Sequence, residues 1–393
     1  MVKPGYKQTE IGVLPEDWDV LSLGSISHFL DSKRIPIKES ERIKMQGDYP
    51  YYGASGIIDY VNDYIFDGEY ILLGEDGANI IDRSSRLAFV VSGKCWINNH
   101  AHVIEPHENM DIHFLAEYLE SISYDEYNTG TAQPKLNREK CNMIPIPIPP
   151  LCEQKQIAIL LKDCDRLIDT LEREVCKKKA IKQGAMQELL TGKKRLPGFS
   201  GEWENIALGM VSSFYNGGTP SKKREDWWQG NIPWISSSDL SEGNITSVKI
   251  NHCISQDAVD HSATRICPKN SVLVVSRVGV GKVAVSPCDL CTSQDFTTVV
   301  SSKHNPYFLA YMLIPIMKNL AGQAQGTSIK GVTVEEIQKI VVPTPAIDEQ
   351  NQIVNTLVDI DSEIMALEEK LEKYRQLKQG MMQQLLTGKI RLV

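Results

Sequence analysis

The chain contains two copies of one long segment, and this duplication restricts its possible folds more than any other feature. Residues 153–157 read Glu-Gln-Lys-Gln-Ile and recur at 349–353 as Glu-Gln-Asn-Gln-Ile, a shift of 196 positions. Leu-Leu-Thr-Gly-Lys at 189–193 recurs at 385–389 with the same shift. From Pro147 to Leu196 about half of the positions are identical to their partners, which indicates duplication of one element.

Apolar residues in each copy alternate at steps of four and three positions, which is the heptad pattern of a coiled coil. Prolines precede each copy, and Gly192 and Gly388 follow, as expected where helices begin and end. About 38 residues per helix correspond to a rod of about 57 Å. A lone helix would expose its apolar seam, so we expect the two copies to pair; an antiparallel pair would be a fixed spacer between the flanking regions. The seam comprises Ile157, Leu161, Cys164, Ile168, Leu171 and Val175 in the first copy, and Ile353, Leu357, Ile360, Ile364, Leu367, Leu371 and Tyr374 in the second.

Two regions of nearly equal size flank the helices. Runs such as 86–91 and 271–275 predict strands, and 111–121 and 305–318 predict short helices that share Phe-Leu-Ala. We therefore predict a mixed α/β chain with a pseudo-two-fold internal repeat. Its expected parts are a first globular domain over 1–145, a first long helix within 146–195, a second domain over 196–342 and a second long helix within 343–393.

The two globular regions differ from each other much more than the helices do. Gly-Thr at 130–131 and 326–327 keeps the 196-residue offset, so the matching framework begins just before each long helix. A constant framework with two different inserts suggests that the inserts discriminate between ligands.

Composition limits the function only loosely. The formal net charge of −8 is not that of a stand-alone DNA-binding protein, although residues 130–196 carry 14 Lys and Arg against 8 Asp and Glu. The N-terminus lacks a secretory signal and no apolar run would span a membrane, so we expect a cytoplasmic protein. Nine scattered cysteines fit a reducing compartment, and Cys288 with Cys291 lacks the second pair that a zinc ribbon needs.

No motif for catalysis is recognisable. Gly279 to Lys282 resembles part of a phosphate-binding loop, but the first glycine is missing and Val283 replaces the magnesium-binding Ser or Thr. Gly74-Glu75-Asp76-Gly77 lacks the further carboxylates of a metal site and is interpreted as a tight turn. A fused methyltransferase would need a methyl-donor motif, and none is visible.

Other segments resemble a known family. The opening residues 6–18, with Leu-Pro-Glu-Asp-Trp at their end, look like the start of specificity subunits of type I restriction-modification systems. Gly-Gly-Thr-Pro-Ser at 217–221 with 227–234, and Pro-Tyr-Tyr-Gly-Ala-Ser-Gly at 50–56, resemble motifs of their target recognition domains. The resemblance extends over essentially the whole chain.

This resemblance implies that each globular domain is a target recognition domain for one half of a bipartite double-stranded DNA site. The helix pair would set the spacing between the halves and dock two methyltransferase subunits, and motor-nuclease subunits would join for restriction. The chain itself would be non-catalytic and without metal or cofactor, since S-adenosylmethionine, ATP and Mg²⁺ would belong to partner subunits. The alternative is a protein-binding scaffold, which would not bind DNA in a salt-sensitive way.

Candidate DNA contacts are polar side chains suited to base edges or phosphates. In the first domain they are Lys33, Arg34, Asn79, Lys94, Asn98, Asn99, His100 and Lys135. In the second they are Thr219, Ser221, Lys222, Lys223, Arg224, Arg277, Lys282, Ser293, Gln294 and Lys330. Trp227, Trp228 and Trp234 are interpreted mainly as core, although base stacking is possible for them. On the helices, the expected partner-binding and spacer residues are Glu153, Gln154, Gln156, Ile157, Leu161, Ile168, Leu171, Glu349, Gln350, Gln352, Ile353, Leu357, Ile364 and Leu367.

Overall fold

The computed structural model describes residues 3–130, 133–324 and 331–392. Its longest elements are two helices of 39 residues each. They are α6 (Leu151–Leu189) and α11 (Ile347–Leu385). The chain divides into unit 1, Met1–Glu172 with Glu369–Val393, and unit 2, Arg173–Glu368. Both boundaries fall inside the long helices, so each unit contains the first half of one helix and the last half of the other.

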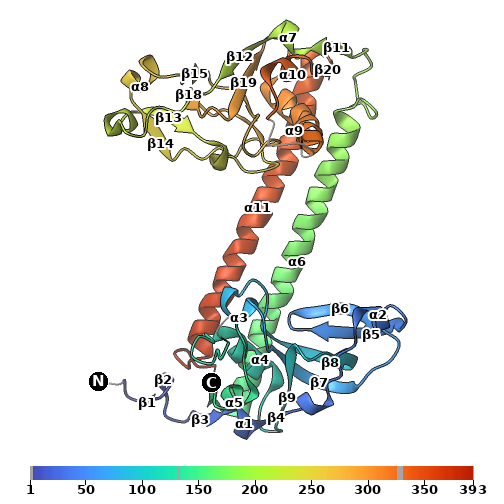
Figure 1. The fold of residues 1–393 in the computed structure, drawn as a ribbon, viewed down its shortest axis with the longest axis vertical. Helices are drawn as coiled ribbons and strands as arrows, with labels where there is room; N and C mark the ends of the chain where they lie inside the picture. The colour runs from blue at the N-terminus through green and yellow to red at the C-terminus, as the bar shows by residue number, and fades with distance from the viewer. Residues whose placement is uncertain (1–2, 131–132, 325–330, 393) are drawn as a thin grey trace. The chain divides into compact units, whose positions relative to one another are not determined.

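Within each unit the two half-helices run antiparallel, as Figure 1 shows for α6 and α11. In unit 1, Asp165 pairs with Lys378 and Glu172 with Arg375, so the residue numbers rise on one helix as they fall on the other. Unit 2 repeats this arrangement with Asp361–Lys182 and Glu368–Lys179. The predicted antiparallel pairing of the repeated helices is therefore confirmed within each unit.

Most of the predicted seam is buried in these pairs. Ile157, Leu161 and Leu171 are at most 2% exposed, and Ile353 and Leu357 at most 1%. Val175, Ile364 and Leu371 are also buried, whereas Cys164, Ile168, Ile360, Leu367 and Tyr374 are half-buried.

Each long helix is followed by the glycine that the sequence indicates. Gly192 has φ +68° and Gly388 has φ +65°, in the left-handed region that favours glycine at the end of a helix. Two residues further on, Lys194 N donates to Glu188 O and Ile390 N to Gln384 O, both at 3.2 Å. These hydrogen bonds satisfy carbonyls that would otherwise be unpaired in the last turn.

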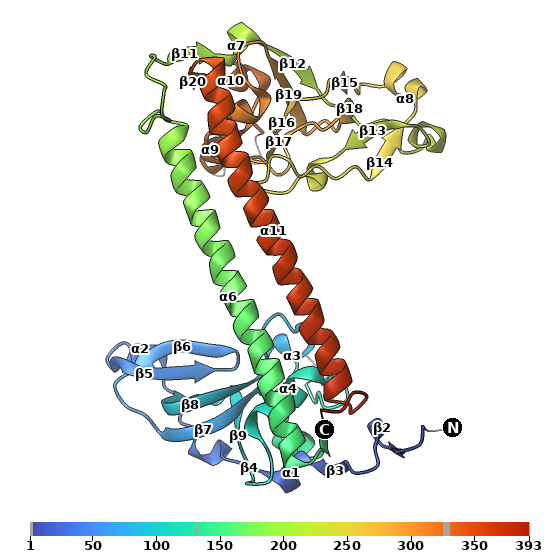
Figure 2. The ribbon, with the colours of Figure 1, turned by 180° about the vertical axis from the view of Figure 1, so that it is seen from behind.

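Unit 1 is built on a six-stranded sheet with the order β4-β9-β7-β8-β5-β6 (Figure 2). The strands are β4 (Ser27–Phe29), β9 (Ala101–Pro106), β7 (Phe66–Gly74), β8 (Ala88–Ile97), β5 (Gln46–Gly53) and β6 (Gly56–Val61). Two small antiparallel sheets pair β1 (Tyr6–Thr9) with β2 (Gly12–Pro15) and β3 (Asp19–Ser22) with β10 (Pro145–Ile148). Short helices complete the unit: α1 (Leu23–Ile26), η1 (Asp31–Lys33), α2 (Glu39–Arg42), α3 (Asn79–Asp82), α4 (Ile112–Ser121) and α5 (Arg138–Asn142).

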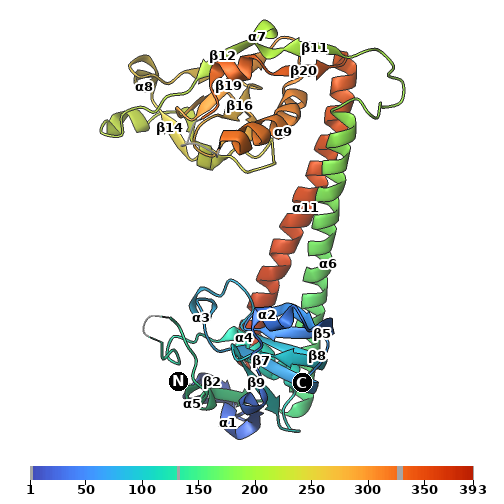
Figure 3. The same ribbon diagram turned by 45° about the vertical axis from the view of Figure 1, so that its right-hand side comes forward.

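Unit 2 contains two four-stranded sheets, ordered β12-β19-β16-β17 and β14-β13-β18-β15. The strands are β12 (Ser212–Asn216), β19 (Phe296–Ser301), β16 (Val272–Val275), β17 (Val283–Val285), β14 (His252–Ile254), β13 (Ile232–Ile235), β18 (Leu290–Thr292) and β15 (Ile266–Cys267). The pair β11 (Glu204–Ala207) and β20 (Val341–Thr344) lies next to the start of α11 (Figure 3). The helices are α7 (Leu208–Val211), η2 (Glu225–Trp228), η3 (Ser237–Asp239), α8 (Gln256–Asp260), α9 (Pro306–Ala324) and α10 (Val334–Gln338).

The two units share one topology although their strands differ in length. In both, a central strand (β7 or β16) lies between an antiparallel strand on each side, β9 and β8 or β19 and β17. In both, a hairpin strand joins in parallel, with Tyr52 opposite Ile97 in unit 1 and Ile235 opposite Thr292 in unit 2. These correspondences, with the repeated helices, confirm the mixed α/β class and the pseudo-two-fold repeat.

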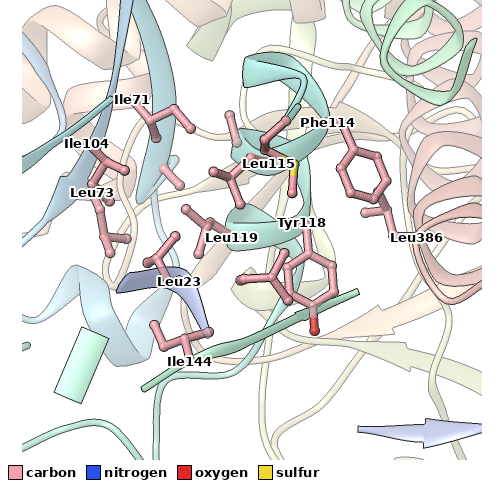
Figure 4. Close-up of a cluster of buried hydrophobic side chains, with 14 of the residues drawn as sticks. Leu23, Ile71, Leu73, Ile104, Phe114, Leu115, Tyr118, Leu119, Ile144 and Leu386 are labelled. Atoms are coloured by element: carbon pink, nitrogen blue, oxygen red, sulfur yellow. The ribbon is translucent and has the colours of Figure 1, made fainter. Parts of the chain in front are cut away.

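The main core of unit 1 lies between the sheet, α4 and the helix halves. Figure 4 shows Ile71, Leu73 and Ile104 from the sheet facing Leu115 and Leu119 of α4, with Phe114 directed toward Leu386. In unit 2, Phe308, Leu309 and Leu313 of α9 pack in one cluster with Val272 and Val299 of the sheet, and Ile353 and Leu357 of α11 belong to it too. The sheet of each unit is thus fixed to its helices by a continuous apolar core, which is the dominant stabilising contribution in a fold of this size.

Among the described residues, none of the helices is both long and apolar enough to cross a membrane. The Gly279–Lys282 segment is the turn of the β16–β17 hairpin, which no helix follows as a phosphate-binding loop would require.

Candidate nucleic-acid interface

In unit 2, the loops that follow three neighbouring strands meet at one end of the sheets. Gly218 N, after β12, donates to Thr292 O at 2.8 Å, and Thr219 Oγ1 donates to Gln294 Oε1. Ser276 N, after β16, donates to Asp295 O at 2.8 Å. The segments predicted separately around 219–224, 277 and 293–294 therefore form one surface.

The exposed part of this surface carries donors of the kind that contact phosphates and bases. Arg277, Ser221, Lys222 and Lys223 are exposed, and Gln294 is exposed on the adjoining loop. Arg224 is also exposed but is already paired, because its guanidinium donates to Asp226 at 2.6 and 2.9 Å. It also lies over the ring of Trp227 at 4.8 Å, so it braces the loop that carries the two lysines.

Two residues predicted as DNA contacts in unit 2 support the loops from within. Ser293 is 3% exposed and its hydroxyl donates to Asp295 at 3.1 Å. Lys282 Nζ donates to the carbonyl oxygen of Ser237 at 3.0 Å. Sequence reasoning could not find these roles, because each depends on a partner brought close only by the fold. Lys330 lies outside the described residues.

The tryptophans occupy positions between core and surface. Trp234 is 5% exposed and its indole N–H donates to Gly218 O at 3.0 Å, which ties β13 to the loop after β12. Trp228 stacks edge-on against Trp234 with ring centroids 5.0 Å apart. The predicted core role holds for Trp234, while Trp227 and Trp228 are only half-buried.

Unit 1 builds the same loop cluster from equivalent hydrogen bonds. Glu75 N donates to His100 O and Leu136 N to Glu75 O, both at 2.8 Å. The counterparts in unit 2 are Ser276 N to Asp295 O and Val332 N to Ser276 O, at 2.8 and 2.7 Å. By this correspondence the loop 98–100 of unit 1 is the equivalent of 293–295 in unit 2.

The loops of unit 1 are held by ion pairs, which unit 2 replaces at this point with hydroxyl groups. Arg34 Nη1 lies 2.8 Å from Glu75 Oε2 and donates to Ala101 O at 2.6 Å. Lys135 Nζ lies 3.3 Å from the other Glu75 oxygen. At the corresponding site of unit 2, the hydroxyls of Ser276 and Thr297 lie 3.2 Å apart. Arg34 was predicted to contact DNA, but its partners make it a support for the loops.

A buried imidazolium lies under this ionic cluster. His102 is 2% exposed, and its Nδ1 lies 2.7 Å from Asp31 Oδ2 while its Nε2 lies 2.8 Å from Leu136 O. Both partners are acceptors, so both ring nitrogens must carry a proton. Burial opposes this charge, but the hydrogen bonds and charges of Asp31 and Cys141 together outweigh it and raise the pKa of His102 to about 10.

The remaining candidates of unit 1 divide by exposure. Lys33, Lys94, Asn99 and His100 are exposed, and the ring of His100 lies 3.0 Å from the Asp76 carboxylate. Asn98 is 4% exposed and its Oδ1 accepts from His100 N at 2.8 Å, so it shapes the turn. Asn79 is half-buried, and its Oδ1 accepts from Ser85 N at 2.8 Å and from the Ser84 hydroxyl at 3.2 Å.

The tip of the β5–β6 hairpin in unit 1 and the segment that follows β13 in unit 2 complete these clusters, and neither was predicted from the sequence. In unit 1, Asn98 N donates to Tyr52 O at 3.1 Å, which places the tip 53–56 beside the loop 98–100. In unit 2, Ser293 N donates to Ile235 O at 2.9 Å, so the segment 236–239 after β13 adjoins Gln294. The serine run at 236–238 was the available signal, because hydroxyls can contact either bases or phosphates.

The family model for the type I restriction modification DNA specificity domain matches residues 15–182 and again residues 200–378. The chain belongs to this family. The two matches cover the two recognition domains and most of the long helices.

Relatives of the type I specificity family align with different shares of the chain. A protein of Haemophilus influenzae named as a type I restriction enzyme specificity subunit is 38% identical over 139 residues, and the match spans 35% of each chain. The type I restriction enzyme MjaVIII specificity subunit of Methanocaldococcus jannaschii is 25% identical over 409 residues, covering 96% of this chain and 94% of its own. The crystal structure of the S subunit of a type I restriction-modification system from M. genitalium has the same fold, with a TM-score of 0.65 at 13% identity over 94% of this chain and 96% of its own.

The glutamates repeated at the start of the two long helices, Glu153 and Glu349, each form an ion pair with an arginine of the same chain. Glu153 is fully buried, and its carboxylate accepts from Trp18 Nε1 at 3.1 Å and from Arg391 Nε at 2.7 Å. In unit 2, Glu349 accepts from Trp203 Nε1 at 3.2 Å and from Arg195 Nε at 2.6 Å. Each of these two glutamates, predicted as partner-binding and spacer residues, clamps the segment after one long helix onto the start of the other.

Each repeat also carries one buried glutamine and one exposed glutamine next to its glutamate. Gln154 and Gln350 are 1% exposed, and each accepts through Oε1 from a backbone N–H just before α4 or α9, at 2.8 Å. Gln156 and Gln352 are exposed and remain available to a partner. Among the described residues, no three His, Cys, Asp or Glu side chains gather as a metal site would need.

Proposed function

We propose that this chain is the sequence-reading subunit of a type I restriction-modification complex, in which each unit reads one half of a bipartite DNA site. One observation carries the proposal: the two units repeat the same cluster of loops on the same strand topology, with different side chains in the loops. A repeated frame with divergent contacts is what two half-sites of different sequence require. Direct readout depends on which polar side chains reach the base edges.

In this proposal some of the exposed residues contact base edges and others contact phosphates. Arg277, Gln294 and the serine segment 236–238 face base edges in unit 2, and Lys222 and Lys223 contact phosphates. In unit 1 the corresponding contacts come from Asn99, His100, Lys33 and Lys94. An arginine or glutamine in bidentate contact with guanine or adenine contributes about 1–3 kcal/mol of discrimination.

The helices would supply the spacing between the half-sites and the docking sites for two methyltransferase subunits. Ile181 in unit 2 and Leu377 in unit 1 stand 196 positions apart and are 46% and 50% exposed. Exposed apolar residues at equivalent positions of a repeat favour the binding of two copies of one partner, because each copy meets the same surface. Motor-nuclease subunits would join this assembly for restriction. The chain contributes no catalytic group, and S-adenosylmethionine, ATP and Mg²⁺ would act in the partner subunits.

The test uses the full chain together with its cognate methyltransferase subunit. The complex is incubated with a pool of random DNA duplexes, and the retained molecules are sequenced. We expect two short fixed blocks separated by a constant unread gap, and an exchange of residues 197–342 for those of a relative should change one block only. R277A and Q294A should relax positions in that same block, whereas N99A should relax the other.

A protein-binding scaffold is the competing function. It predicts no enriched sequence, and no steep fall of DNA affinity as salt rises, although the complex remains intact. Either result with a properly assembled complex would refute the reading function.

A further inference from the structure

Each unit contains a lysine–aspartate pair that joins the two long helices, buried in unit 2 and half-buried in unit 1. In unit 2, Lys182 Nζ lies 2.5 Å from Asp361 Oδ1, and the two side chains are only 11% and 9% exposed. In unit 1, Lys378 Nζ lies 2.7 Å from Asp165 Oδ2, and the two side chains are 12% and 31% exposed. Lys378 is Lys182 shifted by 196 positions and Asp361 is Asp165 shifted by 196, so the duplication preserved the whole pair.

In each recognition domain, a side chain of the helix that packs on the sheet contacts the pair, and it does so from an equivalent position. In α9, Tyr311 follows Phe-Leu-Ala and its hydroxyl donates to Asp361 Oδ2 at 2.6 Å. In α4, Glu117 follows the same three residues and its Oε2 lies 3.0 Å from Lys378 Nζ. Each pair therefore links three elements: the beginning of one long helix, the end of the other, and the helix that packs on the recognition sheet.

The remaining hydrogen-bonding capacity of the pairs is used within the same unit. Lys182 also donates to Gly243 O at 2.9 Å, in a loop of the recognition domain. In unit 1, Arg86 pairs with Glu117 and lies 3.3 Å from Asp165, so two cations face two carboxylates. Both clusters are thus compensated, as buried charges must be if they are to be tolerated.

Such pairs contribute more to geometry than to stability. Removing charges from water costs about as much as their attraction returns, so an apolar set of similar volume is often equally stable or more stable. An apolar contact, however, tolerates rotation and sliding between helices, whereas a buried polar pair is satisfied in one arrangement. A duplicated, largely buried pair at the junction of domain and helices has the properties of an orientation lock.

We infer that Lys182–Asp361 and Lys378–Asp165 are positioning residues that hold each recognition domain at one orientation on its helices, and that they thereby fix the number of unread base pairs between the half-sites. The inference rests on the proposed function. Neither pair touches DNA in this assignment. Their effect reaches the DNA only through the loops that each domain carries.

The test compares gap length, rather than binding alone, between the wild type and K182M/D361L/Y311F. The tyrosine is changed with the pair so that no buried hydroxyl loses its acceptor. The variant, assembled with the methyltransferase subunit, is taken through the random-duplex selection, and its unfolding is followed in urea. We expect the unfolding midpoint and both sequence blocks to be retained, while sites with one base pair more or fewer in the gap gain about tenfold in relative enrichment, equivalent to about 1.4 kcal/mol.

A matched control comes from the exposed ion pairs of the same helices. Lys179–Glu368 lies at 2.7 Å with side chains 58% and 45% exposed, and the duplication repeats it as Arg375–Glu172. K179Q/E368Q should leave the gap distribution unchanged, because an exposed pair adds little orientation energy. K378M/D165L in unit 1 should broaden the gap as the unit 2 variant does.

The outcomes separate the two proposals. A folded triple variant with the wild-type gap distribution overturns the inference and leaves the reading function intact. If the triple variant does not fold, D361N, which removes the charge with little change of shape, is measured for the same broadening, and its absence overturns the inference equally. A wild-type complex that enriches no bipartite site refutes the reading function itself, and the orientation lock with it.

Discussion

Replacing Arg391 by alanine should destabilise unit 1 strongly, because it leaves the fully buried Glu153 carboxylate without a counter-charge. Four N–H groups donate to this carboxylate: Arg391 Nε and Nη2 at 2.7 and 2.8 Å, Trp18 Nε1 at 3.1 Å and Leu392 N at 3.3 Å. R391A removes the two shortest of these bonds. Both belong to the guanidinium, which is the only charged group that donates to Glu153.

The magnitude follows from burial. Breaking a buried pair by removing one partner costs about 3–5 kcal/mol. Two neutral donors remain on Glu153, so we expect the lower end of this range, about 3 kcal/mol. For a unit of about 200 residues this corresponds to a fall in Tm of about 6–12 °C.

Native-state hydrogen exchange measures this unit by unit. Protection of β7 amides in unit 1 should fall by more than about a hundredfold, while β16 amides in unit 2 serve as an internal reference. R195A should reverse the pattern, because Arg195 holds Glu349 in the same way.

The matched control is D17A. Asp17 accepts from the other side of the same guanidinium at 2.8 and 2.9 Å, but its side chain is 52% exposed, so its loss should cost less than about 1 kcal/mol. If R391A were no less stable than D17A, the argument that Glu153 depends on compensation of its charge would be refuted.

Raising the pH from 6.5 to about 10 should destabilise unit 1, because the buried His102 loses its proton. Lowering the pH from 6.5 to about 4 should destabilise unit 2, because burial lowers the pKa of His304 to about 4 and the unfolded chain takes up a proton that the folded chain does not. Urea denaturation of the wild type, H102Q and H304Q tests both signs; variants with the wild-type pH slopes would contradict them. K222A and K223A should each reduce the salt slope of DNA binding by about 1 if each lysine contacts one phosphate, and an unchanged slope would remove that assignment. S238A should relax the half-site read by unit 2 alone, as sequencing of selected duplexes would reveal, and an effect on both blocks would count against the segment 236–238 as a reader.

The long helices were predictable because their information is local. A seam repeated every three or four residues and a duplicated sequence define the helices and their partner without any knowledge of distant contacts. Even the ends followed from Gly192 and Gly388. The expected helical ranges 146–195 and 343–393 are wider than α6 and α11, since Pro147 and Pro343 lie in β10 and β20, which pair with β3 and β11.

The loop clusters were predictable as sets but not residue by residue. Arg34 and Arg277 both follow strands and carry the same group, yet Arg34 faces Glu75 from a distant strand while Arg277 is exposed. Only the fold determines which arginine finds an internal carboxylate. The same limitation explains Glu153, whose partner Arg391 is 238 residues away along the chain.

The distribution of buried charge accounts for what the duplication kept and what it changed. At Glu153 and Glu349, and in the Lys–Asp pairs, the loss of one partner would leave an uncompensated buried charge, so a single substitution is costly and both copies retain the same residues. On the exposed loops a substitution costs little stability. The residues that hold these loops could change together, to ion pairs around Glu75 in unit 1 and to hydroxyl groups at Ser276 in unit 2. A frame made rigid by buried charge can therefore hold two readers of different specificity, because changes in the loops leave the clamps and locks undisturbed.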